Sequence, residues 1–393
     1  MIAKKTGFRK QAAVQFLRNL LFCLCFESRN TKGRKNHKGT TLFFAAFVLP
    51  SCTSCSNEWQ TETPPIFCSR RKYPKATVPF ERISLISVMV RLLLFFLLLP
   101  QLLPAQPLQK ASSGKIVHME NVPSKYVEPR NVDIWLPPQY DGKKRFAVLY
   151  MHDGQMLFDS TTTWNHHAWD VDDVAAKLMA EGRVQDFIVV GIWNAGARRH
   201  ANYFPQKPFD DLSQTDRDSV VQQLQRTLHT TEVFQPNADG YLKFLVEELK
   251  PQIDRSYSVY TDKAHTFIAG SSMGGLISLY AICQYPAIFG GAACLSTHWL
   301  GTFSTENNPV PDAFCRYLQK NLPSPKTHKL YFDCGDQTLD AFYPPIQKRV
   351  DSIMAAKGFT AGNWLTRYFP GEDHSERSWH ERLSIPLLFL LGK

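Results

Sequence analysis

The stretch 269–275, with the sequence AGSSMGG, is the feature that most constrains how this chain folds. The residues that lead into it, 265–269, suit a short buried strand, and those that follow it place apolar side chains at helical spacing. Ser272 then lies at the tip of a sharp strand-to-helix turn. Gly270 and Gly274 stand two positions before and after it, where a side chain would crowd the neighbouring backbone. The pattern predicts a nucleophile elbow.

A serine hydroxyl is a poor nucleophile near neutral pH, so Ser272 needs a base, an orienting acid and an oxyanion hole. The predicted base is His374, which follows the last predicted strand, 364–369, in the loop sequence PGEDH. His380 is the only rival nearby. It falls inside a helical pattern, and we expect it to be a surface or packing residue.

The acid should follow the preceding strand, where the sequence offers Asp333, Asp336 and Asp340. Asp333 lies at the strand end, where its carboxylate is expected to bind the local backbone. Asp336 and Asp340 both lie on the loop. We prefer Asp340, and Asp336 remains the open alternative, because either one preserves the chain order Ser, Asp, His.

The oxyanion hole requires two backbone amides. The amide of Met273 lies at the positive end of the helix that follows the turn. A second amide should come from the loop after the strand 146–151, and Gln155 fits because Gly154 before it lets the chain turn inward. The alternative is that 152–155 forms only a tight turn.

Strand and helix patterns alternate from residue 115 to the end, which predicts one α/β domain with a mostly parallel central sheet and helices on both faces. Two alternating segments, 115–120 and 132–136, suit its antiparallel edge. An amphipathic helix is expected over 241–253. The irregular stretch 194–236 follows a strand, so we expect it either to wall a substrate pocket or to be a solvated loop.

The first 88 residues differ in composition from the rest. They hold 15 Lys and Arg against 4 Asp and Glu, whereas the remainder holds 30 against 31. The net charge of +10 therefore belongs to this leader, and a nucleic-acid partner is not expected. Five of the nine cysteines also lie there, including the pair Cys52 and Cys55. No second ligand pair follows at metal-site spacing, so we expect no metal and no cofactor.

An export signal begins at Met89. A short basic start, an apolar run over 92–103 and a small residue, Ala105, follow the pattern of a secretory signal peptide, and the run is too short to span a membrane comfortably. We therefore expect 1–88 to be an unstructured upstream extension read from a wrong start site, 89–105 a signal peptide, 106–114 a linker and 115–393 the catalytic domain. The alternative for residues 1–88 is a genuine basic extension. With the signal peptide at 89–105, the protein is expected to be periplasmic or extracellular.

Longer motifs give a specific resemblance over about residues 115–392: HDGQMLFD from His152, GIWNAGARRHANYFP from Gly191, AGSSMGG from Ala269, YFDCGDQTLDAFYPP from Tyr331 and PGEDHSERSWHERLSIPLLFLLG from Pro370. These resemble the putative esterase family of α/β hydrolases, which includes enterochelin, feruloyl and acetylxylan esterases, S-formylglutathione hydrolase and mycolyltransferases. The resemblance implies nucleophile Ser272, base His374, oxyanion amides at Gln155 and Met273, and an aspartate at Asp340. The departure at Asp336 and Gln337 keeps the acid open.

The expected reaction is hydrolysis of a small-molecule or carbohydrate ester, such as a siderophore, feruloyl or acetyl-sugar ester. An acyltransferase with the same triad and a non-catalytic binding protein of the same fold are the alternatives. Arg198 and Arg199 are candidates to grip a carboxylate or catecholate, or else belong to a solvated basic loop. The tryptophans Trp164, Trp193 and Trp299 are candidates to line a subsite or to pack in the core.

Overall fold

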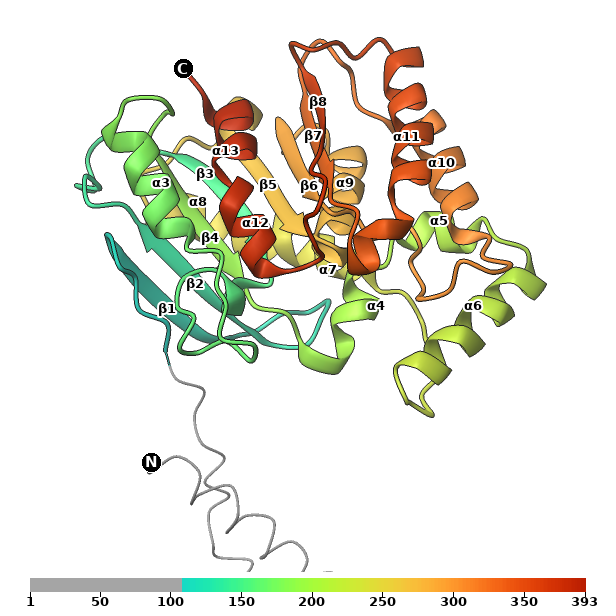
Figure 1. Ribbon diagram of the computed structural model, residues 1–393. Coiled ribbons are helices and arrows are strands. Elements are labelled where there is room, and N and C mark those ends of the chain that lie inside the picture. The colour runs from blue at the N-terminus through green and yellow to red at the C-terminus, as the bar shows by residue number, and fades with distance from the viewer. Residues whose placement is uncertain (1–107) are drawn as a thin grey trace, which may run out of the picture. The chain divides into compact units, whose positions relative to one another are not determined.

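The computed structural model describes residues 108–393, and an eight-stranded mixed sheet forms the centre of this part of the chain (Figure 1). The strands run in the order β1-β2-β4-β3-β5-β6-β7-β8. Their bounds are β1 Lys115–Val122, β2 Arg130–Leu136, β3 Ala147–His152, β4 Phe187–Ile192, β5 Thr266–Ser271, β6 Gly291–Leu295, β7 Lys329–Cys334 and β8 Trp364–Tyr368. The expected mostly parallel α/β sheet is confirmed.

Only one edge of the sheet is antiparallel. β1 pairs with β2 and β2 with β4 in antiparallel fashion, while every pair from β4 to β8 is parallel. Every residue of β3, β4 and β5 is buried, as continuous apolar runs in parallel strands require. The carboxyl ends of β3, β5 and β7 therefore meet at one edge of the sheet, where loops carry functional residues.

Helices cover both faces of the sheet (Figure 1). Alternate strand residues divide between two apolar clusters: Val148 and Tyr150 pack on one face, and Leu149 and Met151 on the other. The second face is covered by α3 Val171–Ala180, α12 Glu376–Arg382 and α13 Ser384–Leu391. The first is covered by α7 Ala238–Lys243, α8 Lys250–Ser256, α9 Met273–Gln284, α10 Val310–Asn321 and α11 Pro344–Ala356.

The irregular stretch after β4 folds into three short or exposed helices. These are α4 Arg199–Tyr203, α5 Gln206–Asp210 and α6 Gln214–Thr227. The helix expected over 241–253 is present within an unbroken helical run that consists of α7, a π-helical turn at Phe244–Leu249 and α8. Pro251 lies at the start of α8 and has no amide hydrogen to donate, which accounts for a break in the α-helical ladder at this point.

The segment just before β1 packs against the sheet instead of acting as a free linker over 106–114. Within its described part, Gln109 is only 6% exposed and hydrogen bonds to the backbone of the loop after β3. The expected extension 1–88 and signal peptide 89–105 lie outside the described residues. In residues 108–393 there is no helix both long and apolar enough to cross a membrane.

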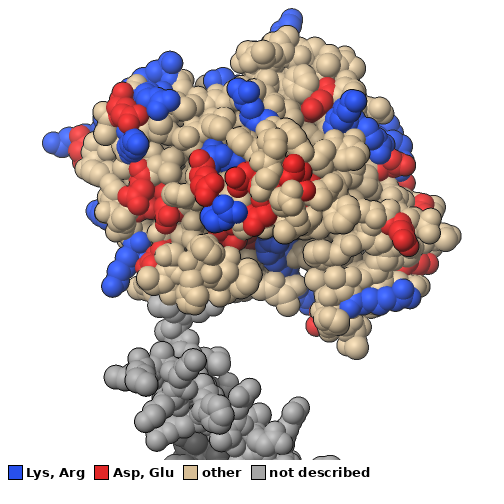
Figure 2. All heavy atoms as spheres, in the orientation of Figure 1, with Lys and Arg blue, Asp and Glu red and all other residues tan. Residues whose placement is uncertain are grey.

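The four cysteines of the described chain, Cys283, Cys294, Cys315 and Cys334, are buried free thiols. On the face shown in Figure 2, acidic and basic side chains lie interspersed. This agrees with the near-balanced charge of the chain after residue 88.

Candidate active site

Ser272 occupies the turn between β5 and α9 with φ of 57° and ψ of −123°, a backbone conformation that non-glycine residues rarely adopt. The turn is held by hydrogen bonds from the Ser272 amide to the Leu295 carbonyl and from the His298 amide to the Ser272 carbonyl. A Cβ on Gly270 would lie within 3.0 Å of the Gly274 backbone, so the sharp turn excludes a side chain there. The structure thus has the elbow geometry predicted from the sequence.

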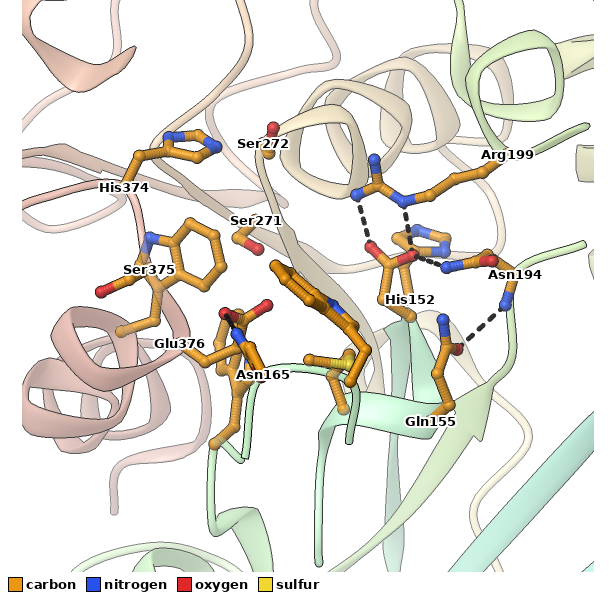
Figure 3. Close-up of a pocket in the computed structure, with 15 residues that line it drawn as sticks. His152, Gln155, Asn165, Asn194, Arg199, Ser271, Ser272, His374, Ser375 and Glu376 are labelled. Atoms are coloured by element: carbon orange, nitrogen blue, oxygen red, sulfur yellow. Dashed lines mark hydrogen bonds and ion pairs between the residues drawn. The ribbon is translucent and has the colours of Figure 1, made fainter. Parts of the chain in front are cut away.

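A cavity of about 530 Å³ opens over this turn. Figure 3 shows Ser272 between the ring of His374 and the guanidinium of Arg199 in this view. The cavity is lined by His152, Asp153, Gln155, Met156, Trp164, Asn165, Trp169, Asn194, Arg199, Ser271, Ser272, His374, Ser375, Glu376 and Trp379. Loops after β3, β4, β5 and β8 supply most of this lining, so the cavity lies at the carboxyl edge of the parallel strands.

His374 pairs with Asp340 beneath the cavity. Nδ1 of His374 donates to Oδ1 of Asp340 over 2.6 Å, and Asp340 is completely buried. The other carboxylate oxygen, Oδ2, accepts from the Ser296 hydroxyl at 2.6 Å and from the Gly335 amide at 2.7 Å. Together these hydrogen bonds hold the Asp340 carboxylate in one orientation, in which Oδ1 binds His374.

The other two aspartates of this loop point elsewhere. Asp333 is buried and bonds to the Tyr331 hydroxyl at 2.9 Å and to Arg382 at 3.0 Å, and burial raises the pKa of its carboxyl. Asp336 is bound by the Tyr368 hydroxyl and the Gly371 amide. Hydrogen bonds from Gln337, Gly371 and Tyr368 lower the pKa of Asp336. Neither carboxylate contacts His374 in the described structure, so of the three only Asp340 lies in position to orient its ring.

A buried polar layer behind Asp340 was not anticipated from the sequence. The Ser296 hydroxyl, which donates to Asp340, itself accepts from Trp379 Nε1 at 2.9 Å and from Arg382 Nη2 at 2.9 Å. Arg382 is 3% exposed, and the same nitrogen binds Asp333 at 3.0 Å. The buried guanidinium lies next to two buried carboxylates and offsets part of their charge within this layer.

Of the two predicted oxyanion residues, Gln155 lines the cavity, and Met273 directly follows Ser272, which also lines it. Met273 is the first residue of α9, and Gln155 lies in a 3₁₀ turn, Gly154–Met156, directly after β3. Within residues 108–393 neither amide donates to a backbone or side-chain acceptor. Both amides are therefore free to bind an anionic oxygen, and the Met273 amide also lies at the positive end of the α9 dipole.

Asp153 and Arg199 form an ion pair in the wall of the cavity. The guanidinium binds both carboxylate oxygens at 2.7 Å, and the Asn194 amide adds a bond of 2.8 Å (Figure 3). Burial by itself would raise the pKa of Asp153, but Arg199 and Asn194 outweigh it and hold that pKa below its ordinary value. One bidentate edge of Arg199 is thus already occupied by a protein carboxylate.

Of the five residues considered as substrate-binding candidates, Arg199 and Trp164 line the cavity. Arg198 turns away and forms ion pairs with Glu128 and Glu232 on the surface, because consecutive residues of a helical turn point in different directions. Trp193 is 7% exposed and its indole donates to buried Asp133 at 2.6 Å. Among the other tryptophans, Trp299 packs in the core, whereas Trp164 lines the cavity and is 81% exposed.

Much of the remaining wall comes from residues to which the sequence analysis assigned no role in a site. Asn165 donates to Glu376 at 2.7 Å, which joins the loop before α3 to the first turn of α12 across 211 residues of sequence. Trp169 and Trp379 pack against each other beside them, with ring centroids 5.5 Å apart. Of the stretch 194–236, Asn194 and Arg199 alone reach the cavity.

Two buried histidines close to the site are held in the neutral form. Burial lowers the pKa of His152 to about 3 and that of His200 to about 4. His152 bonds to the Tyr241 hydroxyl at 2.8 Å, and His200 to the Gly301 carbonyl at 2.8 Å. When the chain unfolds, both rings regain an ordinary pKa of about 6.5.

Acid should therefore destabilise the fold through these two rings. Between about pH 6.5 and pH 4 the unfolded chain binds more protons than the folded chain, so stability present at neutral pH is lost as the pH falls. At pH 5 each ring should lower the free energy of unfolding by about 2 kcal/mol relative to pH 8. Urea unfolding at both pH values should show that the free energy of unfolding of His152→Gln falls by about 2 kcal/mol less than that of the wild type between pH 8 and pH 5. The same substitution at exposed His167 should leave the loss unchanged, and an identical loss in both variants would contradict the argument.

Comparison with known proteins places the chain in a family. The family model described as putative esterase matches residues 124–384, well over half of the sequence. The chain belongs to this family and is an enzyme of the carboxylic-ester hydrolase class. The uncharacterized Bacillus subtilis protein YbbA is 22% identical over 271 residues, which cover 67% of this chain and 93% of YbbA.

Two further relatives are named for an enzymatic activity. An endo-1,4-beta-xylanase/feruloyl esterase of Xylanibacter ruminicola is 26% identical over 266 residues, 65% of this chain, and the matched part makes up only 28% of that protein. The ferri-bacillibactin esterase BesA of Bacillus subtilis is 35% identical over 86 residues, 21% of this chain and 28% of BesA. Both matches cover a minor part of the relative.

Solved structures share the fold at low sequence identity. A ferulic acid esterase superposes with a TM-score of 0.52 at 19% identity, covering 72% of this chain and 98% of that one. An IroE-like serine hydrolase from Shewanella oneidensis gives 0.52 at 17% identity, covering 70% and 79%. The enterobactin esterase FES from Shigella flexneri gives 0.50 at 18%, covering 72% and 62%. These likenesses confirm the α/β-hydrolase type of fold.

Proposed function

We propose that this enzyme is an exported serine esterase in which Ser272, His374 and Asp340 form the catalytic triad and the amides of Gln155 and Met273 form the oxyanion hole. One observation carries the proposal: a serine on a strained strand-to-helix turn and a histidine bound to a buried aspartate line the same cavity. A nucleophile, a base held in a fixed tautomer and two free amides are what acyl transfer through a covalent intermediate requires.

In the proposed first half-reaction, the Ser272 oxygen attacks the ester carbonyl carbon while its proton passes to Nε2 of His374. Asp340 holds the Nδ1–H of the ring, so the ring accepts that proton on the correct nitrogen and the imidazolium is stabilised. The carbonyl oxygen becomes an oxyanion at the amides of Gln155 and Met273. Collapse of this tetrahedral intermediate breaks the bond to the leaving oxygen, which takes the proton from His374 and departs as an alcohol.

The second half-reaction uses water. His374 removes a proton from a water molecule, whose oxygen attacks the acyl carbon bound to Ser272, and a second oxyanion forms at the same two amides. Collapse returns the proton to the serine oxygen and releases the carboxylic acid. An alcohol in place of water would make the same enzyme an acyltransferase, so the products distinguish the two activities.

The cavity wall favours an aryl or acyl-sugar ester over a siderophore ester as substrate. Trp164, Trp169 and Trp379 offer aromatic surface next to the triad residues, and aromatic rings and sugars both stack on such surfaces. Arg198 and Arg199 are each paired with protein carboxylates, so no free pair of guanidinium groups stands ready for an anionic ligand. The feruloyl esterase named among the relatives agrees with this choice.

Production from Met89 in a bacterial host tests the proposal in one experiment. The exported product is expected to begin near Gln106 and to hydrolyse methyl ferulate or acetylated xylan faster than a ferric catecholate triester. One carboxylic acid should appear for each ester consumed, and added glycerol should not divert most of the acyl group. Hydrolysis of none of these esters would contradict the esterase proposal. Peptides from residues 1–88 in protein exported by the native host would contradict the proposed start site.

A further inference from the structure

Gln109, in the segment before β1, reaches the back of the loop that carries Gln155. Its Nε2 donates to the Gly154 carbonyl at 2.8 Å and to Asp133 Oδ2 at 2.6 Å, and its Oε1 accepts from the Phe158 amide at 3.1 Å. The side chain is buried. Exchange of its oxygen and nitrogen would set the oxygen against two acceptors, so the amide has one favourable orientation.

The carbonyl that Gln109 binds belongs to the same peptide unit as the Gln155 amide. This unit is planar and trans, so its C=O and N–H point in opposite directions. A hydrogen bond that fixes the Gly154 carbonyl therefore also fixes the direction of the Gln155 N–H, on the side where Gln155 lines the cavity. The Gly154 carbonyl also accepts from the Leu157 amide at 3.4 Å, which is a longer contact than the one from Gln109.

Asp133 anchors Gln109 to the sheet. It lies on β2, is completely buried, and accepts from Gln109, from Trp193 Nε1 at 2.6 Å and from His118 Nδ1 at 2.5 Å. The three donors come from the segment before β1, from the residue after β4 and from β1 itself. A carboxylate with three donors on separate elements holds the Gln109 side chain more firmly than its own backbone segment would.

We propose that Gln109 is a positioning residue that sets the orientation of the Gly154–Gln155 peptide and thereby the Gln155 arm of the oxyanion hole. This inference rests on the proposed function, in which the Gln155 amide binds the developing oxyanion. It assigns a role in the reaction to a segment that lies outside the sheet and the cavity. Gln109 also lies after the cleavage site expected at Ala105, so an exported chain retains it.

Gln109→Met in the full chain tests the role, because it keeps the length of the side chain and removes its three hydrogen bonds. With p-nitrophenyl acetate we expect kcat to fall about tenfold, with KM within about twofold and the midpoint of the pH–rate profile unchanged. The loss should be smaller than the ~10²–10³-fold found when an oxyanion donor is removed, since the amide remains and only its orientation is released.

Ser112→Ala is the matched control. Ser112 anchors the same segment to Asp172 and Asp173 on α3 and does not touch the loop after β3. Its kcat should stay within about twofold of wild type. Wild-type kcat in folded Gln109→Met would overturn the inference, because the hydrogen bonds of Gln109 would then not affect the reaction. An equal loss of kcat in Ser112→Ala would also overturn it, because the segment would then act only through general stability.

Gln109→Asn keeps the test decisive if the methionine variant does not fold. It retains the carboxamide oxygen and nitrogen but is one methylene too short to reach their partners, so a reduced kcat at unchanged KM is expected, and wild-type kcat would overturn the inference. Ser272→Ala separates this outcome from failure of the proposed function. If that variant stays active, the triad proposal fails whatever Gln109 does; if it is inactive while Gln109→Met is fully active, only the role of Gln109 fails.

Discussion

Ser272→Ala is expected to lower kcat for ester hydrolysis by about 10³-fold or more, the size of effect seen when a triad member is removed. The substitution deletes one oxygen atom from a turn whose shape is set by backbone hydrogen bonds to Leu295 and His298, and these bonds remain. The melting temperature should therefore change little. Stopped-flow kinetics with an excess of p-nitrophenyl acetate would show the loss as the absence of an acylation burst.

Ser271→Ala provides the control inside the same turn. Ser271 also lines the cavity but stands at the end of β5, one residue before the strained position. Its kcat is expected to stay within about threefold of wild type. Hydrolysis by Ser272→Ala at the wild-type rate, or equal losses in both variants, would show that the elbow serine is not the nucleophile.

The sequence predicted the strands and the elbow well because local patterns determine them. A continuous apolar run as short as 146–151 is typical of a strand covered on both faces, and β3 at Ala147–His152 is such a strand. The expected helix over 241–253 is present, but the sequence pattern did not reveal its π-helical turn, because apolar spacing is insensitive to the missing amide of Pro251. Apolar spacing indicates which face is buried, but it does not report the hydrogen-bond ladder.

The walls of the site were harder to predict because they depend on contacts between distant segments. Asn165 and Glu376 meet across 211 residues, and neither belongs to a local pattern that indicates a cavity. Trp193 follows a strand, as a substrate-binding residue often does, but buried Asp133 on a neighbouring strand draws its indole inward. The partner that decides the direction of such a side chain is unknown until the strand order is known.

Asp340→Asn is expected to keep the fold and to lower kcat by about 10⁴-fold, through the tautomer of His374. Two donors, the Ser296 hydroxyl and the Gly335 amide, point at the inner carboxylate oxygen. The amide oxygen of asparagine must take that position, so its NH₂ group faces His374. An NH₂ donor at Nδ1 stabilises the tautomer that carries its proton on Nε2, the nitrogen that should accept the proton of Ser272.

Asp336→Asn is the matched comparison, since it makes the same chemical change four residues earlier. Asp336 accepts from the Tyr368 hydroxyl and the Gly371 amide on the surface, and an asparagine oxygen can accept from either. Its kcat should remain within about threefold of wild type. The two variants are compared by steady-state kinetics and by the pH dependence of kcat/KM. A large loss in Asp336→Asn together with a small one in Asp340→Asn would make Asp336 the acid, because only the carboxylate that holds Nδ1–H of His374 controls which nitrogen is left to act as the base.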